Sequence, residues 1–84
     1  MIYYVYILFS LKDKRFYVGK TKDLKKRLER HNNGWVKATT YRRPLRLVYY
    51  ERFKTPGEAF LRERELKKPS AGKYKEEIRK RLAL

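Results

Sequence analysis

The pattern of hydrophobic and polar positions predicts two short strands at the start of the chain. Residues 2–9 form an apolar run rich in β-branched and aromatic side chains, and residues 16–18 form a shorter one. The polar residues 10–14 between them have turn chemistry, and two such runs around a short link are typical of an antiparallel hairpin. If the loop holds an even number of residues and no bulge, Tyr6 and Tyr17 face the same side. This pair is either a cross-strand aromatic contact or part of a site.

The next segment has the period of a helix, and residues 21–23 offer N-caps for it. At about 100° per residue, Leu24 and Leu28 define an apolar stripe that faces the sheet. Arg27 and His31 fall on the same stripe, where an unpaired charge is costly. Arg27 therefore requires a carboxylate or a bound phosphate, unless it extends to the edge of the stripe or pairs with a local Glu. His31 is either a structural histidine or part of the same site.

Further along, the pattern predicts a third strand and two more helices. Residues 45–53 follow Pro44 and contain an apolar run, which indicates a strand with both faces partly covered. Residues 55–58 form a capping box with proline at the first helical position, which starts the second helix. A last helix is expected at about residues 71–82, with a role in packing alone.

The second helix has one carboxylate inside its apolar stripe. Glu63 lies between Ala59 and Leu66 on the face that turns towards the sheet. A carboxylate in that place requires a cation. The candidates are a metal ion, Arg27, or Lys67 four residues on, which would be a plain helix-surface partner.

The charge balance predicts a polyanionic partner. Charged residues make up 39% of the 84 residues, and 24 Lys and Arg against 9 Asp and Glu give a net charge of +15. Nucleic acid is the first candidate, and an anionic membrane surface is the second. A membrane-surface protein would need an amphipathic helix with bulky apolar anchors, and no segment offers one convincingly. We therefore expect nucleic acid and no membrane.

The connection between the first helix and the third strand mixes cations with aromatic residues. Lys37, Tyr41, Arg42 and Arg43 are the residues expected to contact nucleic acid there. Exposed aromatic rings among cations are suited to stacking on bases. Trp35 and Tyr41 could equally cover the core, and the sequence leaves both alternatives open.

Residue usage excludes several classes of site. There is no cysteine and only one histidine, which excludes disulfides, thiolate zinc sites and multi-histidine metal sites. A metal would have to be held by oxygen atoms, as magnesium and manganese are. The N-terminal apolar run is too short to span a membrane and lacks the flanks of a signal peptide. We expect one domain, residues 1–84, in the cytoplasm.

Several short motifs stand in an order and spacing that are specific only when taken together. They are Tyr4-Val5-Tyr6, Tyr17-Val18-Gly19, Arg27-Leu28, His31-Asn32 and Glu63. Over nearly the whole chain this set resembles the GIY-YIG nuclease domain. It is most similar to the small single-domain branch, which resembles the N-terminal domain of bacterial nucleotide-excision repair nucleases. The resemblance implies an α+β fold with a three-stranded antiparallel sheet flanked by about three helices, in the order ββαβαα, and a context of DNA repair.

The resemblance also implies an activity, that of a metal-dependent endonuclease that is structure-directed or weakly specific. The implied substrate is nucleic acid, with DNA favoured over RNA, and a protein partner that directs the enzyme is a further expectation. The implied catalytic residues are Tyr6, Tyr17, Arg27, His31 and Glu63, and Lys20 would contact nucleic acid.

Each implied residue has an expected role. Glu63 would bind one Mg²⁺ or Mn²⁺ ion, Arg27 would contact the scissile phosphate, and Tyr6 or Tyr17 would act as general base. A free tyrosine has a pKa of about 10, and we expect Lys20, Arg27 and the metal to lower it.

Two positions depart from the pattern of the family. Tyr4 stands where the first motif has a glycine, and the asparagine that many members carry near the end of the domain is absent. The missing asparagine and the charge of +15 keep a second function open, a basic nucleic-acid-binding module without turnover.

Overall fold

The computed structural model describes residues 1–82 and has the predicted order ββαβαα. Its strands and helices are β1 (Tyr3–Ser10), β2 (Phe16–Thr21), α1 (Leu24–Asn32), β3 (Leu45–Phe53), α2 (Pro56–Lys67) and α3 (Gly72–Arg81). Short 3₁₀ turns at Thr40–Arg42 and Pro69–Ala71 precede β3 and α3. The α+β fold is confirmed, and β3 has the predicted bounds.

The three strands form one antiparallel sheet in the order β2-β1-β3. Tyr6 of the central strand β1 is paired with Gly19 of β2 on one side and with Tyr50 of β3 on the other. A bulge between Ile7 and Leu8 shifts the register against β3. Because side chains alternate along a strand, the even-numbered residues of β1 face one side and the odd-numbered residues face the other.

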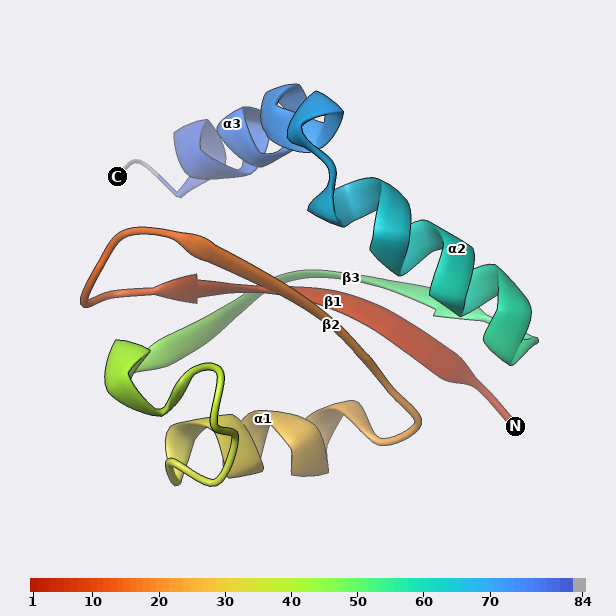
Figure 1. The fold of residues 1–84 in the computed structure, drawn as a ribbon, viewed down its shortest axis with the longest axis horizontal. Coiled ribbons are helices and arrows are strands. Elements are labelled where there is room, and N and C mark those ends of the chain that lie inside the picture. Colours follow the sequence, from red (N-terminus) through yellow and green to blue (C-terminus); the bar gives the residue numbers. More distant parts are fainter. Residues whose placement is uncertain (83–84) are drawn as a thin grey trace.

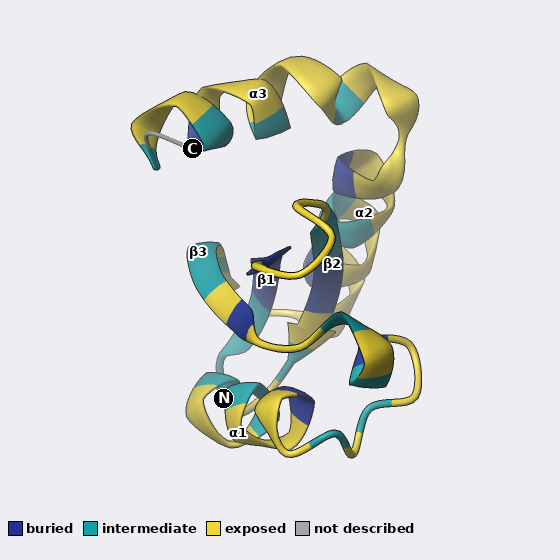
Figure 2. Ribbon diagram, turned by 90° about the vertical axis from the view of Figure 1, so that its left-hand side faces the viewer, coloured by how far each residue is buried: buried dark blue, intermediate teal, exposed yellow. Residues whose placement is uncertain are grey.

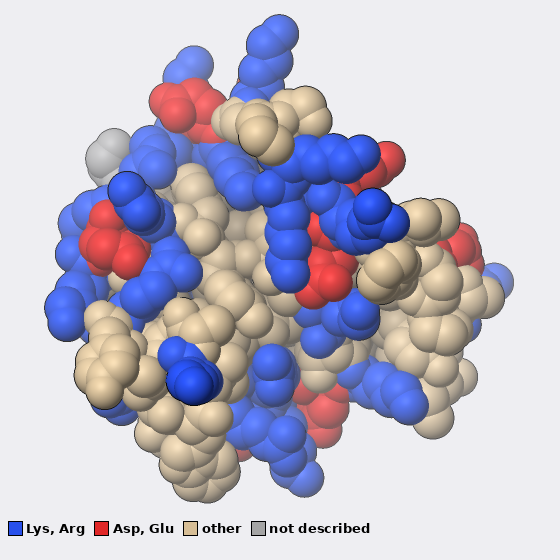
Figure 3. Space-filling view, in the orientation of Figure 1, with Lys and Arg blue, Asp and Glu red and all other residues tan. Residues whose placement is uncertain are grey.

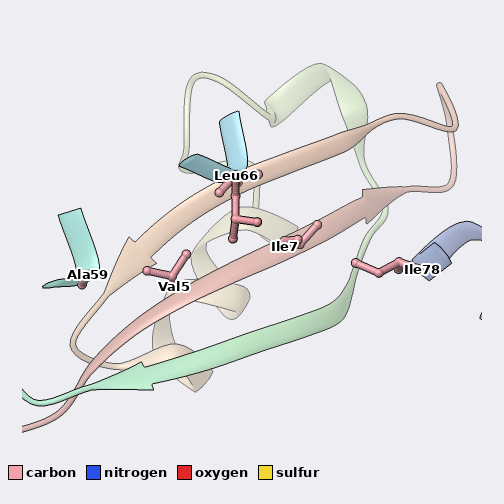
Figure 4. Packing of buried hydrophobic residues seen from close by; sticks show 6 residues of the cluster. Val5, Ile7, Ala59, Leu66 and Ile78 are labelled. Atoms are coloured by element: carbon pink, nitrogen blue, oxygen red, sulfur yellow. The ribbon is translucent and has the colours of Figure 1, made fainter. Parts of the chain in front are cut away.

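Helices cover both faces of the sheet. Figure 1 shows α1 on one side and α2 with α3 on the other, and Figure 2 shows that burial concentrates on β1 and β2, with exposed residues on the outer sides of the helices. The larger core lies under α2 and α3 (Figure 4). Its buried members are Val5, Ile7, Val18, Ala59, Leu66 and Ile78. The smaller core lies under α1 and is built on Tyr6, Leu8 and Leu45.

Local chemistry starts the helices where the sequence predicts. The side chain of Asp23 accepts a hydrogen bond from the amide of Lys26 at 3.1 Å, which caps α1. Thr55 caps α2 by accepting from the amide of Glu58 at 3.3 Å. Glu58 accepts in turn from the Thr55 hydroxyl at 2.8 Å. These caps fix the points at which α1 leaves β2 and α2 leaves β3.

Polar contacts join the helices to the third strand. Asn32, the last residue of α1, exchanges two hydrogen bonds with the backbone of Leu45, at 3.0 and 2.9 Å. Arg62 of α2 binds the Glu51 carboxylate of β3 through two nitrogens, both at 2.9 Å, and this pairing lowers the pKa of Glu51 against the opposing effect of burial. The ring of Tyr74 meets that of Tyr49 edge-on at 5.3 Å, so α3 packs on β3 as expected.

Within residues 1–82, no helix has both the length and the apolar character that a membrane crossing requires.

Candidate active site

Tyr6 and Tyr17 face the same side of the sheet, as predicted. The paired residues have a constant odd sum, and six residues lie between the last pair, Phe9 and Phe16, so the even-loop condition holds. The two tyrosine ring centroids are 6.4 Å apart. Both rings also lie edge-on to His31, at 5.7 Å for Tyr6 and 5.1 Å for Tyr17. The tyrosines therefore meet over α1 rather than merely contacting each other across the strands.

Gly19 makes room for the hydroxyl of Tyr6. A Cβ atom added to Gly19 would lie 2.5 Å from the Tyr6 hydroxyl oxygen and 3.1 Å from a ring carbon of Tyr17. Any larger residue would push Tyr6 out of place. Gly19 was expected only as part of a motif, with no role of its own. A glycine inside a strand, where it weakens the sheet, was the available signal of such a close approach.

The stripe of α1 faces the sheet as its period predicts. Leu24, Arg27 and Leu28 are partly buried, and His31 is fully buried. The Nε of Arg27 donates to the hydroxyl of Tyr6 at 3.3 Å. Among the residues that the structure describes, no acidic side chain forms a salt bridge with Arg27. The alternative of a local Glu partner is therefore wrong, and the guanidinium keeps donors for an external anion.

His31 links Tyr6 to the loop that follows α1. Its Nε2 lies 2.8 Å from the Tyr6 hydroxyl, and its Nδ1 lies 2.7 Å from the hydroxyl of Thr39. Because Tyr6 accepts from Arg27, its own hydrogen is free to donate to Nε2. His31 then carries its hydrogen on Nδ1 and donates to Thr39, whose hydroxyl donates to the carbonyl of Val36 at 3.4 Å. One tautomer thus satisfies the whole chain of hydrogen bonds, and Thr39 selects it.

Thr39 is a site residue that was not predicted from the sequence. It is fully buried within a polar loop, and the sequence pattern contains no signal for that burial. Its contact with His31 joins residues from two separate elements, which no local period reveals.

The environment shifts the pKa values of this group in opposite directions. Burial raises the pKa of Tyr6 to about 12, although the hydrogen bond from Arg27 acts to lower it. Burial, helped by the charge of Arg27, lowers the pKa of His31 to about 4. The hydrogen bond to Tyr6 raises the pKa of Arg27. Arg27 therefore acts on the pKa of Tyr6 in the expected direction, but the loss of water around the hydroxyl outweighs its effect.

Glu63 comes to this region from the other layer of the fold. It lies on the inward stripe of α2, and its side chain is only 13% exposed. Its two carboxylate oxygens lie 3.5 Å from the Nζ atoms of Lys20 and Lys67. The expected alternative of Lys67 as a partner is borne out, and Lys20 of β2 is a second partner that helical spacing could not reveal. Arg27 does not pair with it.

The charge of Glu63 nonetheless reaches the tyrosine. It adds to the raised pKa of Tyr6, so the carboxylate lies within electrostatic range of the hydroxyl. Tyr6, Tyr17, Arg27 and His31 form one contiguous group. Glu63 stands beside that group, with its carboxylate held by lysines.

The donor set at Glu63 fits a hard cation held by few protein ligands. Residues 1–82 contain no cluster of three or more His, Cys, Asp or Glu side chains that could hold a metal. Both nitrogens of His31 are engaged by Tyr6 and Thr39. One carboxylate with open positions for water and phosphate oxygens suits Mg²⁺ or Mn²⁺ better than zinc.

A hollow of about 540 Å³ opens beside Arg27, and we call it the cationic hollow. It is lined by Lys20, Thr21, Lys22, Asp23, Lys26, Arg27 and Arg30. Lys22, Lys26 and Arg30 had no role predicted from the sequence, and their part in this hollow was missed. In Figure 3, Lys and Arg side chains far outnumber acidic ones on the face turned to the viewer. The hollow therefore suits a phosphate backbone that passes Arg27.

The loop between α1 and β3 answers one open question. Trp35 is 74% exposed and Tyr41 is 83% exposed, so the alternative that they cover the core is wrong. Lys37 and Arg43 are also exposed, although the Nε of Arg43 donates to the carbonyl of Thr40 at 2.8 Å. These four side chains are open to an external partner.

Arg42 is engaged by contacts within the protein. Its Nε donates to the Asp13 carboxylate at 2.7 Å, and its Nη2 donates to the carbonyl of Phe16 at 3.2 Å. Arg42 thereby lowers the pKa of Asp13. The side chain ties the loop to the β1–β2 turn, and this internal pairing accounts for it without nucleic acid.

Comparisons with known proteins agree with this geometry. Residues 2–75 match the family model described as the GIY-YIG catalytic domain. A UPF0213 protein of Staphylococcus saprophyticus is 48% identical over 66 residues, which cover 77% of this chain and 79% of that protein. A UPF0213 protein of Clostridium perfringens is 48% identical over 66 residues, covering 77% and 70%.

A solved structure has the same fold. The solution NMR structure of a UPF0213 protein from Bacillus halodurans is 37% identical to this chain and has a TM-score of 0.56. The match covers 93% of this chain and 83% of that one. The family match over residues 2–75 and these relatives lead to one conclusion: the chain belongs to the GIY-YIG family.

Proposed function

We propose that this protein is a divalent-metal-dependent endonuclease that hydrolyses phosphodiester bonds of DNA and is structure-directed or weakly specific. One observation carries the proposal. The hydroxyl of Tyr6 is held between the Nε of Arg27, at 3.3 Å, and the Nε2 of His31, at 2.8 Å. Arg27 also lines the cationic hollow. The Tyr6 hydroxyl can accept a proton, and His31 can accept the proton that Tyr6 releases. Both lie next to Arg27, the cation that connects them to the hollow in which a phosphate backbone would lie.

The hydrogen bonds provide a path for the proton of the attacking water. As water attacks the phosphorus, its proton passes to the Tyr6 hydroxyl, and Tyr6 passes its own proton to Nε2 of His31. The bond from phosphorus to the leaving oxygen breaks, and that oxygen takes a proton from solvent. The raised pKa of Tyr6, about 12, means that little tyrosinate exists near neutral pH. The two transfers therefore occur together with the attack.

Arg27 would stabilise the charge that develops on the phosphate. Its guanidinium has donors beyond the one given to Tyr6, and donors fixed before the reaction need no rearrangement during it. The negative charge on the attacked phosphate would also favour the protonated form of His31, against the burial that lowers its pKa.

Glu63 would hold the metal ion, with Mg²⁺ or Mn²⁺ as the fitting species. A bound ion would neutralise charge on the phosphate and on the leaving oxygen. Without an ion, Lys20 and Lys67 keep the carboxylate charge-paired.

The pairing of Glu63 with two lysines also favours the second candidate, a binding module without turnover. A carboxylate that is already balanced by protein cations needs no metal. The net charge of +15 supports binding in either case. The two candidates differ only in whether the bound strand is cut, and a partner protein that directs the molecule would be compatible with both.

The deciding experiment compares Glu63→Gln with Glu65→Gln. Glu65 lies two residues away, is 60% exposed and pairs with Arg62, so it is a matched control. Wild type and both variants are incubated with flaps, junctions, nicked duplexes and single strands, as DNA and as RNA, with manganese and with chelator. We expect wild type and Glu65→Gln to cut DNA with manganese, and Glu63→Gln to bind without cutting. No cutting by wild type on any substrate would assign the protein to the binding class.

A further inference from the structure

A second hollow lies on the same face of the sheet as Tyr6. Its volume is about 630 Å³, within the range of sites that hold a small ligand. Its apolar and aromatic lining comes from Tyr4, Leu24, Leu28, Leu47 and Tyr50. Leu24 and Leu28 belong to α1, so this groove runs between α1 and the sheet. We call it the aromatic groove.

An aromatic ring is open to a ligand in this groove. Tyr50 is 49% exposed although its neighbour in the sheet, Tyr6, is fully buried. Tyr4 meets Tyr50 edge-on, with ring centroids 6.0 Å apart and planes at 62°. Tyr4 therefore supports Tyr50 from one side, and the exposed part of the Tyr50 ring is accessible for stacking.

The rim of the groove identifies the charge of its occupant. Lys22, Lys25 and Arg52 line it and are exposed. The one acidic residue of the lining is Asp23, whose carboxylate caps α1. An aromatic platform with a cationic rim matches a nucleotide, with its base on the ring and its phosphates on the cations. An apolar peptide would leave these cations without partners.

The aromatic groove and the cationic hollow meet at one point of the chain. Lys22 and Asp23, which lead from β2 into α1, line both. A strand that passes Arg27 with its backbone in the cationic hollow can therefore place a neighbouring nucleotide in the groove. Base pairing prevents this in an intact duplex, because a base must leave the stack to enter a pocket. An unpaired nucleotide has no such cost.

We propose that the aromatic groove is a subsite for one unpaired nucleotide next to the scissile phosphate, with its base stacked on Tyr50. The placement of this subsite next to the scissile phosphate rests on the proposed nuclease function. It makes nucleic acids with an unpaired nucleotide, such as bulges and flaps, the preferred substrate class. DNA and RNA both offer this chemistry, and the two are separate arms of the test.

The test measures binding in chelator, so it needs no cleavage. Three labelled duplexes of equal length carry a paired site, one unpaired nucleotide, or one unpaired abasic nucleotide, each as DNA and as RNA. We expect wild type to bind the unpaired nucleotide about tenfold more tightly than the abasic one, as expected for stacking of one base. Equal affinity of wild type for these two would overturn the proposal.

Variants locate the effect. Tyr50→Leu keeps an apolar side chain without a ring and should lose the preference, whereas Tyr50→Phe should retain it. Tyr74→Leu removes a tyrosine of α3, which packs on Tyr49 and lies outside the groove, and should behave as wild type. A thermal melt of each variant verifies folding. The ratio of the affinities for the unpaired nucleotide and the abasic one does not depend on the fraction of the protein that is active. A preference that persists in Tyr50→Leu would overturn the assignment.

A direct readout comes from a photo-crosslinking halogenated uracil at the unpaired position. Crosslinks to Tyr4 or Tyr50 support the subsite, and crosslinks to Trp35 or Tyr41 instead would overturn it. A wild-type dimer in sedimentation that Tyr50→Leu dissolves would assign the groove to a second copy of the chain and also overturn it. Loss of cleavage alone would reject the nuclease and leave the binding result intact, so the two failures are distinguishable.

Discussion

The character of Tyr6 depends on which of two effects on its hydroxyl is larger. Arg27 donates a hydrogen bond and favours the tyrosinate, whereas burial favours the neutral phenol, and the pKa rises to about 12. His31 experiences burial in the opposite sense because its charged form is the protonated one, and its pKa falls to about 4. Both residues are therefore neutral over the whole range between these values. Neutral pairs joined by a 2.8 Å hydrogen bond are suited to exchanging a proton rather than to storing charge.

The neutral state of both Tyr6 and His31 predicts how the cleavage rate depends on pH. The competent form has neutral His31 and protonated Tyr6, so it is lost as pH falls towards about 4 and as it rises towards about 12. We expect the single-turnover rate to be nearly flat from about pH 6 to about pH 9 at saturating metal. A tenfold rise for each pH unit across that range would instead indicate a preformed tyrosinate.

Removing the hydroxyl oxygen of Tyr6 tests the role of this residue in cleavage. Tyr6→Phe keeps the ring over Gly19 and deletes the hydroxyl that contacts Arg27 and His31. We expect the cleavage rate to fall by about 10²–10⁴, the usual worth of a positioned proton acceptor, with DNA binding in chelator unchanged. Tyr41→Phe makes the same change on an exposed ring and should cut normally. Wild-type turnover by Tyr6→Phe would leave this tyrosine as a packing residue.

Strand β2 brings three roles together within a few residues. Tyr17 contacts His31, Gly19 makes room for Tyr6, and Lys20 turns to the opposite face and pairs with Glu63. The alternation of the strand therefore divides the site between the α1 layer and the α2 layer. β2 does this as an edge strand, through Tyr17 to α1 on one face and through Lys20 to α2 on the other.

Gly19→Ala tests the strand as a spacer. The added Cβ would lie 2.5 Å from the Tyr6 hydroxyl, so the ring must move and its hydrogen bonds must break. We expect a loss of about 1–3 kcal/mol in the free energy of unfolding, measured by denaturant titration, and loss of cleavage. Gly57→Ala is the control, since its added Cβ meets no atom within 4 Å. Full activity in Gly19→Ala would show that the site tolerates displacement of Tyr6.

The elements were predictable because their signals are local. The period of α1 placed Arg27 and His31 on the inward stripe, and the alternation of the hairpin placed both tyrosines on one face. The partners that complete the site were not predictable. Thr39 and the Lys20 partner of Glu63 come from other elements, and their positions depend on how the chain closes. The net rise in the pKa of Tyr6 was not predictable either, because its largest cause is burial, and burial depends on the assembled core.

The whole molecule combines a small core with an excess of positive charge. The cationic hollow alone gathers five Lys and Arg side chains around one Asp. Their mutual repulsion destabilises the isolated protein and is relieved when a polyanion replaces their counterions. Binding should therefore be mainly a salt-dependent event, while the catalytic group adds little to affinity.

This predicts a steep salt dependence. If the five cations of the cationic hollow neutralise about five phosphates, the log–log slope of duplex DNA affinity against salt is about −4.5. Lys26→Gln should reduce the magnitude of the slope by about one unit, and Lys75→Gln on α3 should leave it unchanged. Fluorescence anisotropy between low and physiological salt measures both. A flat wild-type curve would contradict an electrostatic interface.

The loop after α1 is tied to the fold on both sides of its exposed aromatic rings. Asn32 holds Leu45, Thr39 holds His31, and Arg42 holds Asp13, while Trp35 and Tyr41 point outward. A loop that is already ordered loses little conformational entropy when a partner stacks on it. Thr39 thus has two effects, since the contact that orients the buried imidazole also preorganises the outer surface. A substitution of Thr39 that breaks this contact would therefore weaken two things together: the stacking of a partner on the exposed rings and the proton path from Tyr6 to His31.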